Sequence, residues 1–118
     1  MRAEQQQLPG LDLGIDLIRL PPPTVPVATI QEQFEAFHEL NPWVLRELEN
    51  LTARCVEQRW PRVGIGMLFE LLRWRYGEAT RGDRFRLNNN FRSRYVRLLL
   101  GQHPEWASLF STRALRAD

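Results

Sequence analysis

The chain has 118 residues, of which 43% are hydrophobic and 25% charged, with 16 basic and 14 acidic side chains and a formal net charge of +2. These values are typical of one globular domain. They exclude an internal disulfide, since Cys55 is the only cysteine, and a membrane-spanning helix, since no apolar run reaches the roughly 18 residues required. Cys55 falls in an apolar-periodic segment and is expected to be a small buried hydrophobe. No secretory signal pattern opens the chain, so we expect a cytoplasmic protein.

The charges are distributed unevenly along the chain. All 16 basic residues are arginine, an absence of lysine for which a GC-rich genome is a sufficient cause. Residues 59–97 contain ten arginines and three acids, a net +7, whereas residues 1–58 contain four arginines and nine acids, a net −5. A local positive field of this kind is typical of a nucleic-acid-binding surface.

Residues 1–28 differ in pattern from the rest. Over residues 11–17, leucine and isoleucine alternate with Asp12, Gly14 and Asp16. Pro21–Pro23 and Pro26 then favour an extended path. We expect an extended, proline-rich N-terminal arm. It is either a flexible linker or a segment that pairs with a sheet edge or docks on a partner, and its acids could also lie over the basic half of the chain.

Two helices are expected at the start of the remaining region, residues 29–118. Thr29 and Glu32 have the spacing of a capping box, which predicts a helix from Thr29 to about Leu40. Asn41 is a good N-cap and Pro42 suits the first helical position. They predict a second helix ending near Gln58.

The second half of the chain predicts two more helices and a final turn. Val63–Ile65 is strand-like and is followed by a helix over Gly66–Tyr76, and Phe85–Leu87 alternates like a brief strand. A fourth helix is expected over Asn90–Gln102, with a last helical turn opened by Pro104. The fold class expected is therefore mainly α: a compact domain of four to five helices with a helix-turn-helix or winged-helix-like core.

The fourth predicted helix divides into two faces at 100° per residue. The apolar face comprises Phe91, Tyr95, Leu98 and Leu99. The polar face comprises Asn90, Ser93, Arg94 and Arg97. Such side chains contact phosphates and base edges, which makes this segment a candidate recognition helix for double-stranded DNA. The predicted nucleic-acid-binding residues are Arg84, Arg86, Asn90, Arg92, Ser93, Arg94 and Arg97.

Other interpretations of the same residues remain open. The arginine face could dock an acidic protein, or it could be a solvated face whose arginines pair with Glu47 or Glu49. Trp60 and Arg62 are candidate partner-binding residues, because Trp60 lies beside a proline and is the tryptophan expected to be exposed. The other tryptophans are expected mostly in the core. The N-terminal arm could also mediate docking or a homodimer.

No catalytic, metal or cofactor site is expected. The two histidines, His38 and His103, fall near predicted helix ends, where the helix dipole favours them without any catalytic role. Zinc and calcium spacings, phosphate-binding glycine loops and nucleophile elbows are missing from the sequence. Glu70 is an acid in an apolar helix, which could indicate a functional role, or it could pair at the surface with Arg73 or with the Trp74 N–H.

Two motifs resemble a known group of proteins. Arg62-Val-Gly-Ile-Gly-Met-Leu-Phe-Glu-Leu-Leu-Arg-Trp74 and Phe85-Arg-Leu-Asn-Asn-Asn-Phe-Arg-Ser-Arg-Tyr-Val-Arg97, with the lead-in Phe37–Trp43, resemble a family of small proteins from bacteriophages, prophages and GC-rich bacteria. The resemblance covers about residues 34–115 and carries no established activity. It implies a mobile-element origin. The sequence therefore predicts a small DNA-binding regulator or accessory factor, or alternatively a non-enzymatic inhibitor or adaptor that docks a host or phage protein.

Overall fold

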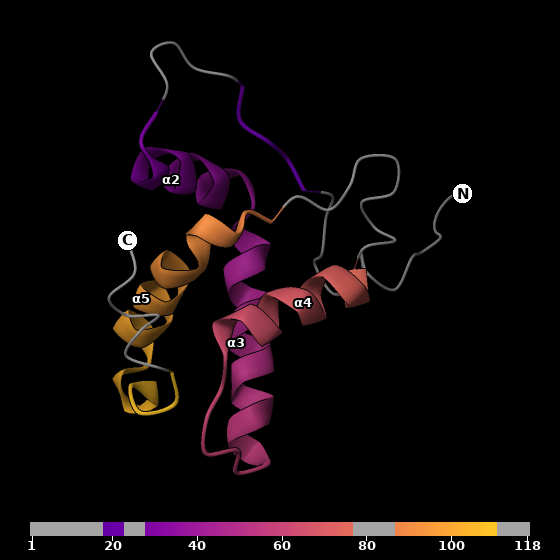
Figure 1. The fold of residues 1–118 in the computed structure, drawn as a ribbon, viewed down its shortest axis with the longest axis vertical. Helices are drawn as coiled ribbons and strands as arrows, with labels where there is room; N and C mark the ends of the chain where they lie inside the picture. Colours follow the sequence, from indigo (N-terminus) through magenta and orange to yellow (C-terminus); the bar gives the residue numbers. More distant parts are fainter. Residues whose placement is uncertain (1–17, 23–27, 77–86, 111–118) are drawn as a thin grey trace, which may run out of the picture.

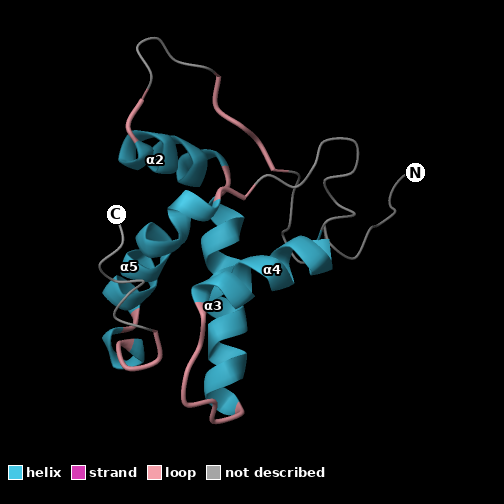
Figure 2. Ribbon diagram, in the orientation of Figure 1, coloured by secondary structure: helices cyan, strands magenta, loops and turns pink. Residues whose placement is uncertain are grey.

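Four α-helices make up most of the part of the chain that the computed structural model describes, residues 18–22, 28–76 and 87–110. They are α2 (Ile30–Leu40), α3 (Pro42–Glu57), α4 (Ile65–Tyr76) and α5 (Arg92–Gln102), with short 3-10 helices η2 (Asn89–Phe91) and η3 (Pro104–Trp106) at the two ends of α5. These ranges contain no strand (Figure 2). The mainly helical class and the approximate bounds of all four helices are confirmed.

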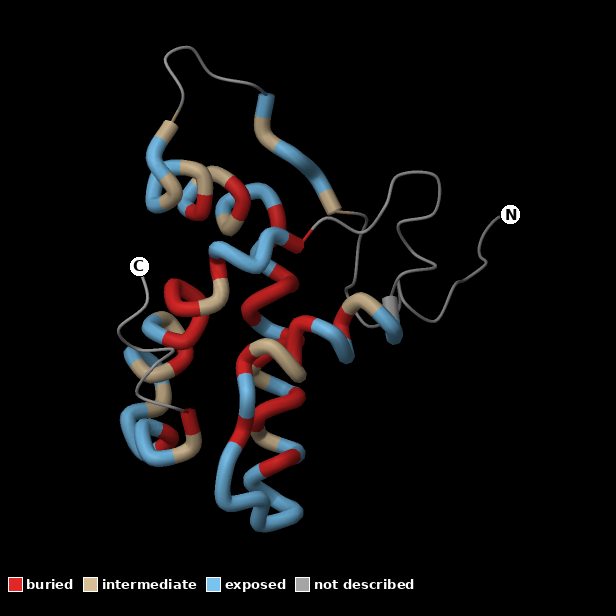
Figure 3. The backbone as a smooth tube through the Cα atoms, viewed as in Figure 1, coloured by how far each residue is buried: buried red, intermediate tan, exposed pale blue. Residues whose placement is uncertain are grey.

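The helix α3 is the centre of the arrangement. It contacts α2 near one end, α4 crosses it, and α5 packs against both α3 and α4 (Figure 1). The core lies where these helices meet (Figure 3), and Leu48, Leu72 and Leu99 within it are fully buried. An aromatic cluster joins α2 to α5, with the rings of Phe34 and Tyr95 edge to face at 4.9 Å between centroids. Cys55 is buried, as expected.

The start of α2 is fixed by the predicted capping box. The Thr29 hydroxyl accepts a hydrogen bond of 3.1 Å from the Glu32 amide, and the Glu32 carboxylate accepts one of 2.9 Å from the Thr29 amide. Both amides would otherwise lack an intrahelical partner. The carboxylate also lies at the positive end of the helix dipole.

Asn41 joins the N-terminal segment to the helical body. Pro42 occupies the first position of α3 as predicted, but the Asn41 side chain makes no capping bond there. It is fully buried. Its amide nitrogen donates to the carbonyl groups of Arg19 (2.8 Å) and Phe37 (3.0 Å), and its oxygen accepts from the Arg19 amide (2.8 Å). Residues 18–22 of the predicted arm are thus attached to the α2–α3 corner, while residues 1–17 and 23–27 lie outside the described ranges.

The α3–α4 connection is a tight turn instead of the predicted strand. Arg59 has a φ of 63°, in the left-handed region. The Arg59 amide donates to the Val56 carbonyl (2.9 Å) and the Trp60 amide to the Cys55 carbonyl (3.0 Å), the bond pair of a Schellman motif, in which glycine is usual at this position. Residues 62–64 are irregular and α4 already begins at Ile65, so the predicted strand is wrong. The second predicted strand falls largely outside the described residues.

Candidate functional site

The polar face predicted on α5 is only partly exposed. Ser93 and Arg94 retain 4% and 9% of their accessible surface, so the prediction that they face solvent is wrong. For Arg94, the burial includes a contact with α2. The Arg94 Nε donates to the Gln31 side chain of α2 at 2.9 Å, and another guanidinium nitrogen donates to the Asn90 carbonyl at 3.3 Å. In this arrangement Arg94 ties α2 to α5.

The other predicted contacts are not gathered on one face. Asn90 and Arg97 are exposed, and Arg92 is half-buried. The guanidinium of Arg92 lies over Gly66 in the first turn of α4, where an added Cβ would be 3.4 Å from the Arg92 Cζ. Arg84 and Arg86 lie outside the described residues. A helix that reads DNA must present successive side chains to the groove, and α5 does not present the set that the sequence predicts.

Two of the asparagines before α5 have structural roles. The side chain of Asn88 caps η2 by accepting a hydrogen bond of 2.8 Å from the Asn90 amide. The side chain of Asn89 accepts a bond of 2.6 Å from Arg73, whose guanidinium also donates to the Leu87 carbonyl and pairs with Glu70, each at 2.5 Å. Of the alternatives that the sequence left open for Glu70, the structure shows the pair with Arg73. Arg73 thus connects the end of α4 to the segment before α5.

The α3–α4 turn presents Trp60 to solvent between two exposed arginines. Trp60 is 41% exposed, which confirms the prediction from sequence, and Arg59 and Arg62 are both exposed. An aromatic ring flanked by guanidinium groups can stack on a base or on a planar side chain.

The outer end of α4 carries a tryptophan that was expected in the core. Trp74 is 86% exposed, and Leu71, three residues earlier, is 38% exposed. The helical period could have predicted this exposure, because Trp74 lies about 200° around the helix from Leu72 of the buried stripe. Trp43 and Trp106 are buried, as expected.

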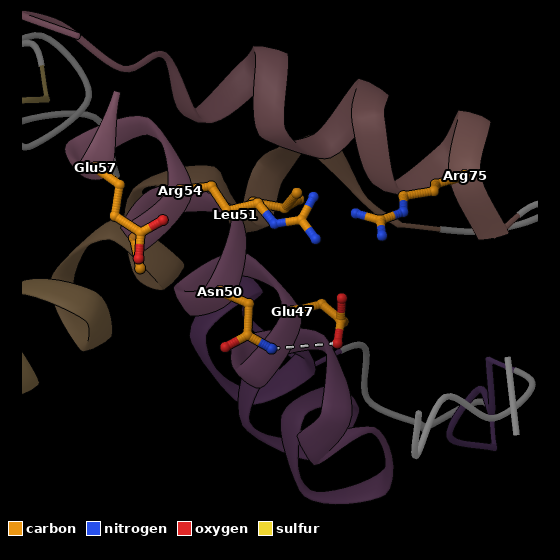
Figure 4. A pocket seen from close by; sticks show the side chains of 7 residues that line it. Glu47, Asn50, Leu51, Arg54, Glu57 and Arg75 are labelled. Carbon is orange, nitrogen blue, oxygen red and sulfur yellow. Dashed lines mark hydrogen bonds between the residues drawn. The ribbon is translucent and has the colours of Figure 1, made fainter. Parts of the chain in front are cut away.

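A hollow of about 350 Å³ opens between α3 and the outer end of α4. Its lining residues are Glu47, Asn50, Leu51, Ala53, Arg54, Glu57 and Arg75. The guanidinium groups of Arg54 and Arg75 point toward one another across it (Figure 4). Glu47 is only 9% exposed, and its carboxylate accepts a long hydrogen bond of 3.5 Å from Asn50. Sequence reasoning missed this hollow because it depends on how α4 crosses α3.

The two histidines have environments that shift their pKa values in opposite directions. His103, which follows α5, lies between the carboxylates of Glu49 on α3 and Glu105, and its ring stacks on Trp106 at 3.9 Å between centroids. The hydrogen bond to Glu49 is the main reason why the pKa of His103 is raised above 6.5. His38 stacks on Phe34, and burial lowers its pKa below 6.5.

We therefore expect the two histidines to titrate on opposite sides of pH 6.5, His103 above it and His38 below it. Because the raised pKa of His103 favours the protonated folded state, its contribution to stability is fully present below the unfolded pKa and is lost as the pH rises through the folded pKa. NMR titration of the imidazole signals measures both values. In the Glu49→Gln variant the His103 pKa should fall while that of His38 stays unchanged. A His103 pKa at or below that of His38 would contradict this assignment.

No cluster of three or more histidine, cysteine, aspartate or glutamate side chains suited to a metal ion occurs within residues 18–22, 28–76 and 87–110. Over the same ranges, no helix is both long enough and apolar enough to cross a bilayer. No family model, curated protein or solved structure matches the chain. The functional interpretation therefore depends on the geometry of the exposed side chains.

Proposed function

We propose that this chain is a non-enzymatic protein-interaction module that docks a partner on the outer end of α4 and the adjoining turns of α3. We call this region the α3–α4 surface and define it by Arg54, Leu71, Trp74 and Arg75. The observation that carries the proposal is the 86% exposure of Trp74. An isolated exposed apolar residue is ordinary, but Leu71 lies beside it on the same helix and Arg75 follows it directly.

The composition of the α3–α4 surface supports protein docking. Tryptophan and arginine are enriched among the residues that dominate binding energy at protein interfaces. An indole that is almost fully exposed in the free protein would bury a large apolar area against a partner. An inhibitor or adaptor acting on a host or phage protein in the cytoplasm would fit the mobile-element resemblance.

A site-specific photo-cross-linking experiment tests this proposal. With benzoylphenylalanine in place of Trp74, we expect a discrete protein adduct in cells that naturally produce the chain. The same substitution at Glu35, an exposed position on α2, should give no such adduct. Because Trp74 is so exposed, its replacement should leave the free energy of unfolding within about 0.5 kcal/mol of the original. The absence of a protein adduct at position 74 in a folded variant would contradict the proposal.

Nucleic-acid binding is the second candidate, and the α3–α4 turn favours it. Trp60 is exposed between Arg59 and Arg62, and the left-handed backbone of Arg59 is a conformation that often accompanies functional sites. Together with the exposed Arg97, these side chains could contact DNA phosphates and bases. In this second proposal, α4 and α5 would bind DNA in the manner of a helix-turn-helix. In the same experiment, a nuclease-sensitive adduct from position 60 would support it, and a nuclease-resistant one would not.

A further inference from the structure

The α3–α4 turn carries two arginines that have no partner among the described residues. Residues 56–62, which comprise the end of α3 and this turn, are all exposed and lie at the end of α3 away from α2 (Figure 1, Figure 3). Within the described ranges, nothing gives the side chain of Arg59 or Arg62 a hydrogen bond or an ion pair. Glu57 is the one acid of this run, and residues 107–110, which a backbone hydrogen bond joins to the residue after it, are uncharged. Two guanidinium groups against one carboxylate leave one unmatched positive charge.

Arg59 adopts a backbone conformation that is costly for any residue with a Cβ. Its φ of 63° lies in the left-handed region, which glycine adopts freely. It also occupies the position after the helix at which glycine is usual. A guanidinium therefore stands where glycine would fold more readily. Strain of this kind clusters at functional sites, and here it favours a role for the side chain in binding.

Trp60 is held between the two arginines with part of its ring open to solvent. Its amide donates to the Cys55 carbonyl at 3.0 Å, and Pro61 restricts the chain directly after it. At 41% exposure the indole is partly packed and partly accessible, so it can receive a planar group without a large rearrangement. A cationic, an aromatic and a second cationic side chain follow one another along the turn. This order suits a nucleic-acid strand, in which phosphates and planar bases alternate.

We propose that the α3–α4 turn binds single-stranded nucleic acid, with one unpaired base stacked on Trp60 and the flanking phosphates held by Arg59 and Arg62. This inference rests on the second candidate function, whose ligand it specifies, and is independent of docking at the α3–α4 surface. Bases inside a duplex are stacked on one another, so an indole can stack only on a base that has left the duplex. A nucleotide supplies the anion and the planar group together, whereas an acidic side chain supplies only the anion.

Fluorescence anisotropy of end-labelled probes with the full-length protein tests the inference. The probes are an oligothymidylate of about 20 nucleotides, an abasic sugar-phosphate strand of the same length and a mixed-sequence duplex of the same length. We expect the oligothymidylate to bind about tenfold more tightly than the abasic strand, because one stacked base contributes on the order of that factor. It should also bind more tightly than the duplex. Trp60→Leu should remove the difference between the oligothymidylate and the abasic strand.

Arg59→Gly separates binding from folding. Because glycine adopts this φ without strain, the variant should unfold at the same or a higher denaturant concentration and yet bind the oligothymidylate more weakly. Arg59→Gly and Arg62→Gln should each lower the slope of log K against log salt by about 0.7, the value for one phosphate contact on a single strand. Arg46→Gln is the matched control, since it removes an exposed arginine more than about 15 Å along α3 from the turn. It should leave the affinity and the slope unchanged.

The outcomes separate this inference from the second candidate function. Equal binding of the oligothymidylate and the abasic strand, or an unchanged preference in Trp60→Leu, would overturn the stacking of a base on the indole. A duplex that binds more tightly than the oligothymidylate would overturn the single-strand inference and leave nucleic-acid binding standing. If no probe binds, or if position 60 gives only a nuclease-resistant protein adduct, both are overturned. Tighter binding of an oligouridylate of the same length would support the inference, with RNA as the ligand.

Discussion

Replacing Asn41 with alanine is expected to lower the free energy of unfolding by about 3 kcal/mol and to release residues 18–22 from the helical body. The buried amide of Asn41 serves three backbone groups: the amide and carbonyl of Arg19 and the carbonyl of Phe37. Alanine leaves all three without these partners. The Phe37 carbonyl keeps its second hydrogen bond, 2.9 Å from the backbone amide of residue 41, so the loss falls mainly on the amide and carbonyl of Arg19.

Denaturant unfolding measures the loss of stability, and hydrogen exchange of the Arg19 amide measures the release of the segment. Asn50→Ala is the matched control, because Asn50 is exposed on α3 and its side chain makes a single long contact, with Glu47, among the described residues. It should change the free energy of unfolding by less than about 0.5 kcal/mol. If Asn41→Ala behaves like Asn50→Ala, and the Arg19 amide keeps its protection, the attachment described here does not operate in solution.

The local chemistry of the sequence was sufficient to predict the helices. Thr29 and Glu32 specify a capping box in which both partners lie within one turn, and Pro42 is favourable only at the start of a helix. The structure confirms both helix starts. Such signals succeed because they depend on residues three or four positions apart.

Properties that depend on packing between helices were not predictable in the same way. The pattern of α5 placed Ser93 and Arg94 opposite the apolar stripe, and no local signal indicates that Ser93 is buried or that Arg94 contacts α2. Asn41 could be recognised as a helix boundary, but its bond to Arg19 spans 22 positions in sequence. The hollow between Arg54 and Arg75 likewise depends on the crossing of α3 and α4.

The two exposed tryptophans of the candidate sites differ in how well the sequence predicted their exposure. Trp60 was predicted to be exposed because Pro61 interrupts the pattern beside it, and it is exposed. Trp74 lies within a regular helix, and the preference of large rings for the core outweighed its position off the buried stripe. Residue type therefore gave the wrong prediction for Trp74, the residue that contributes most to the proposed docking surface.

Arg94→Ala is expected to destabilise the protein by roughly 2–3 kcal/mol, whereas Arg97→Ala should cost less than about 1 kcal/mol. Both arginines lie on α5, but Arg94 is 9% exposed and bonds to Gln31 and Asn90, while Arg97 is exposed. Removing the Arg94 side chain leaves a cavity under α2 and takes away the donor for two acceptors.

Denaturant unfolding of the two single variants tests this difference, and Arg94→Met serves as an additional variant that keeps the apolar stem and removes the charged head. We expect Arg94→Met to fall between the original protein and Arg94→Ala. Equal stability of all three would contradict the role of Arg94 in joining α2 to α5.

The result also decides which variant is suitable for measuring DNA binding by α5. Because Arg94→Ala would weaken binding through partial unfolding, a phosphate contact on α5 is properly tested by Arg97→Ala alone. That variant should lower the salt dependence of DNA affinity by about 0.9 in the slope of log K against log salt if Arg97 neutralises a phosphate.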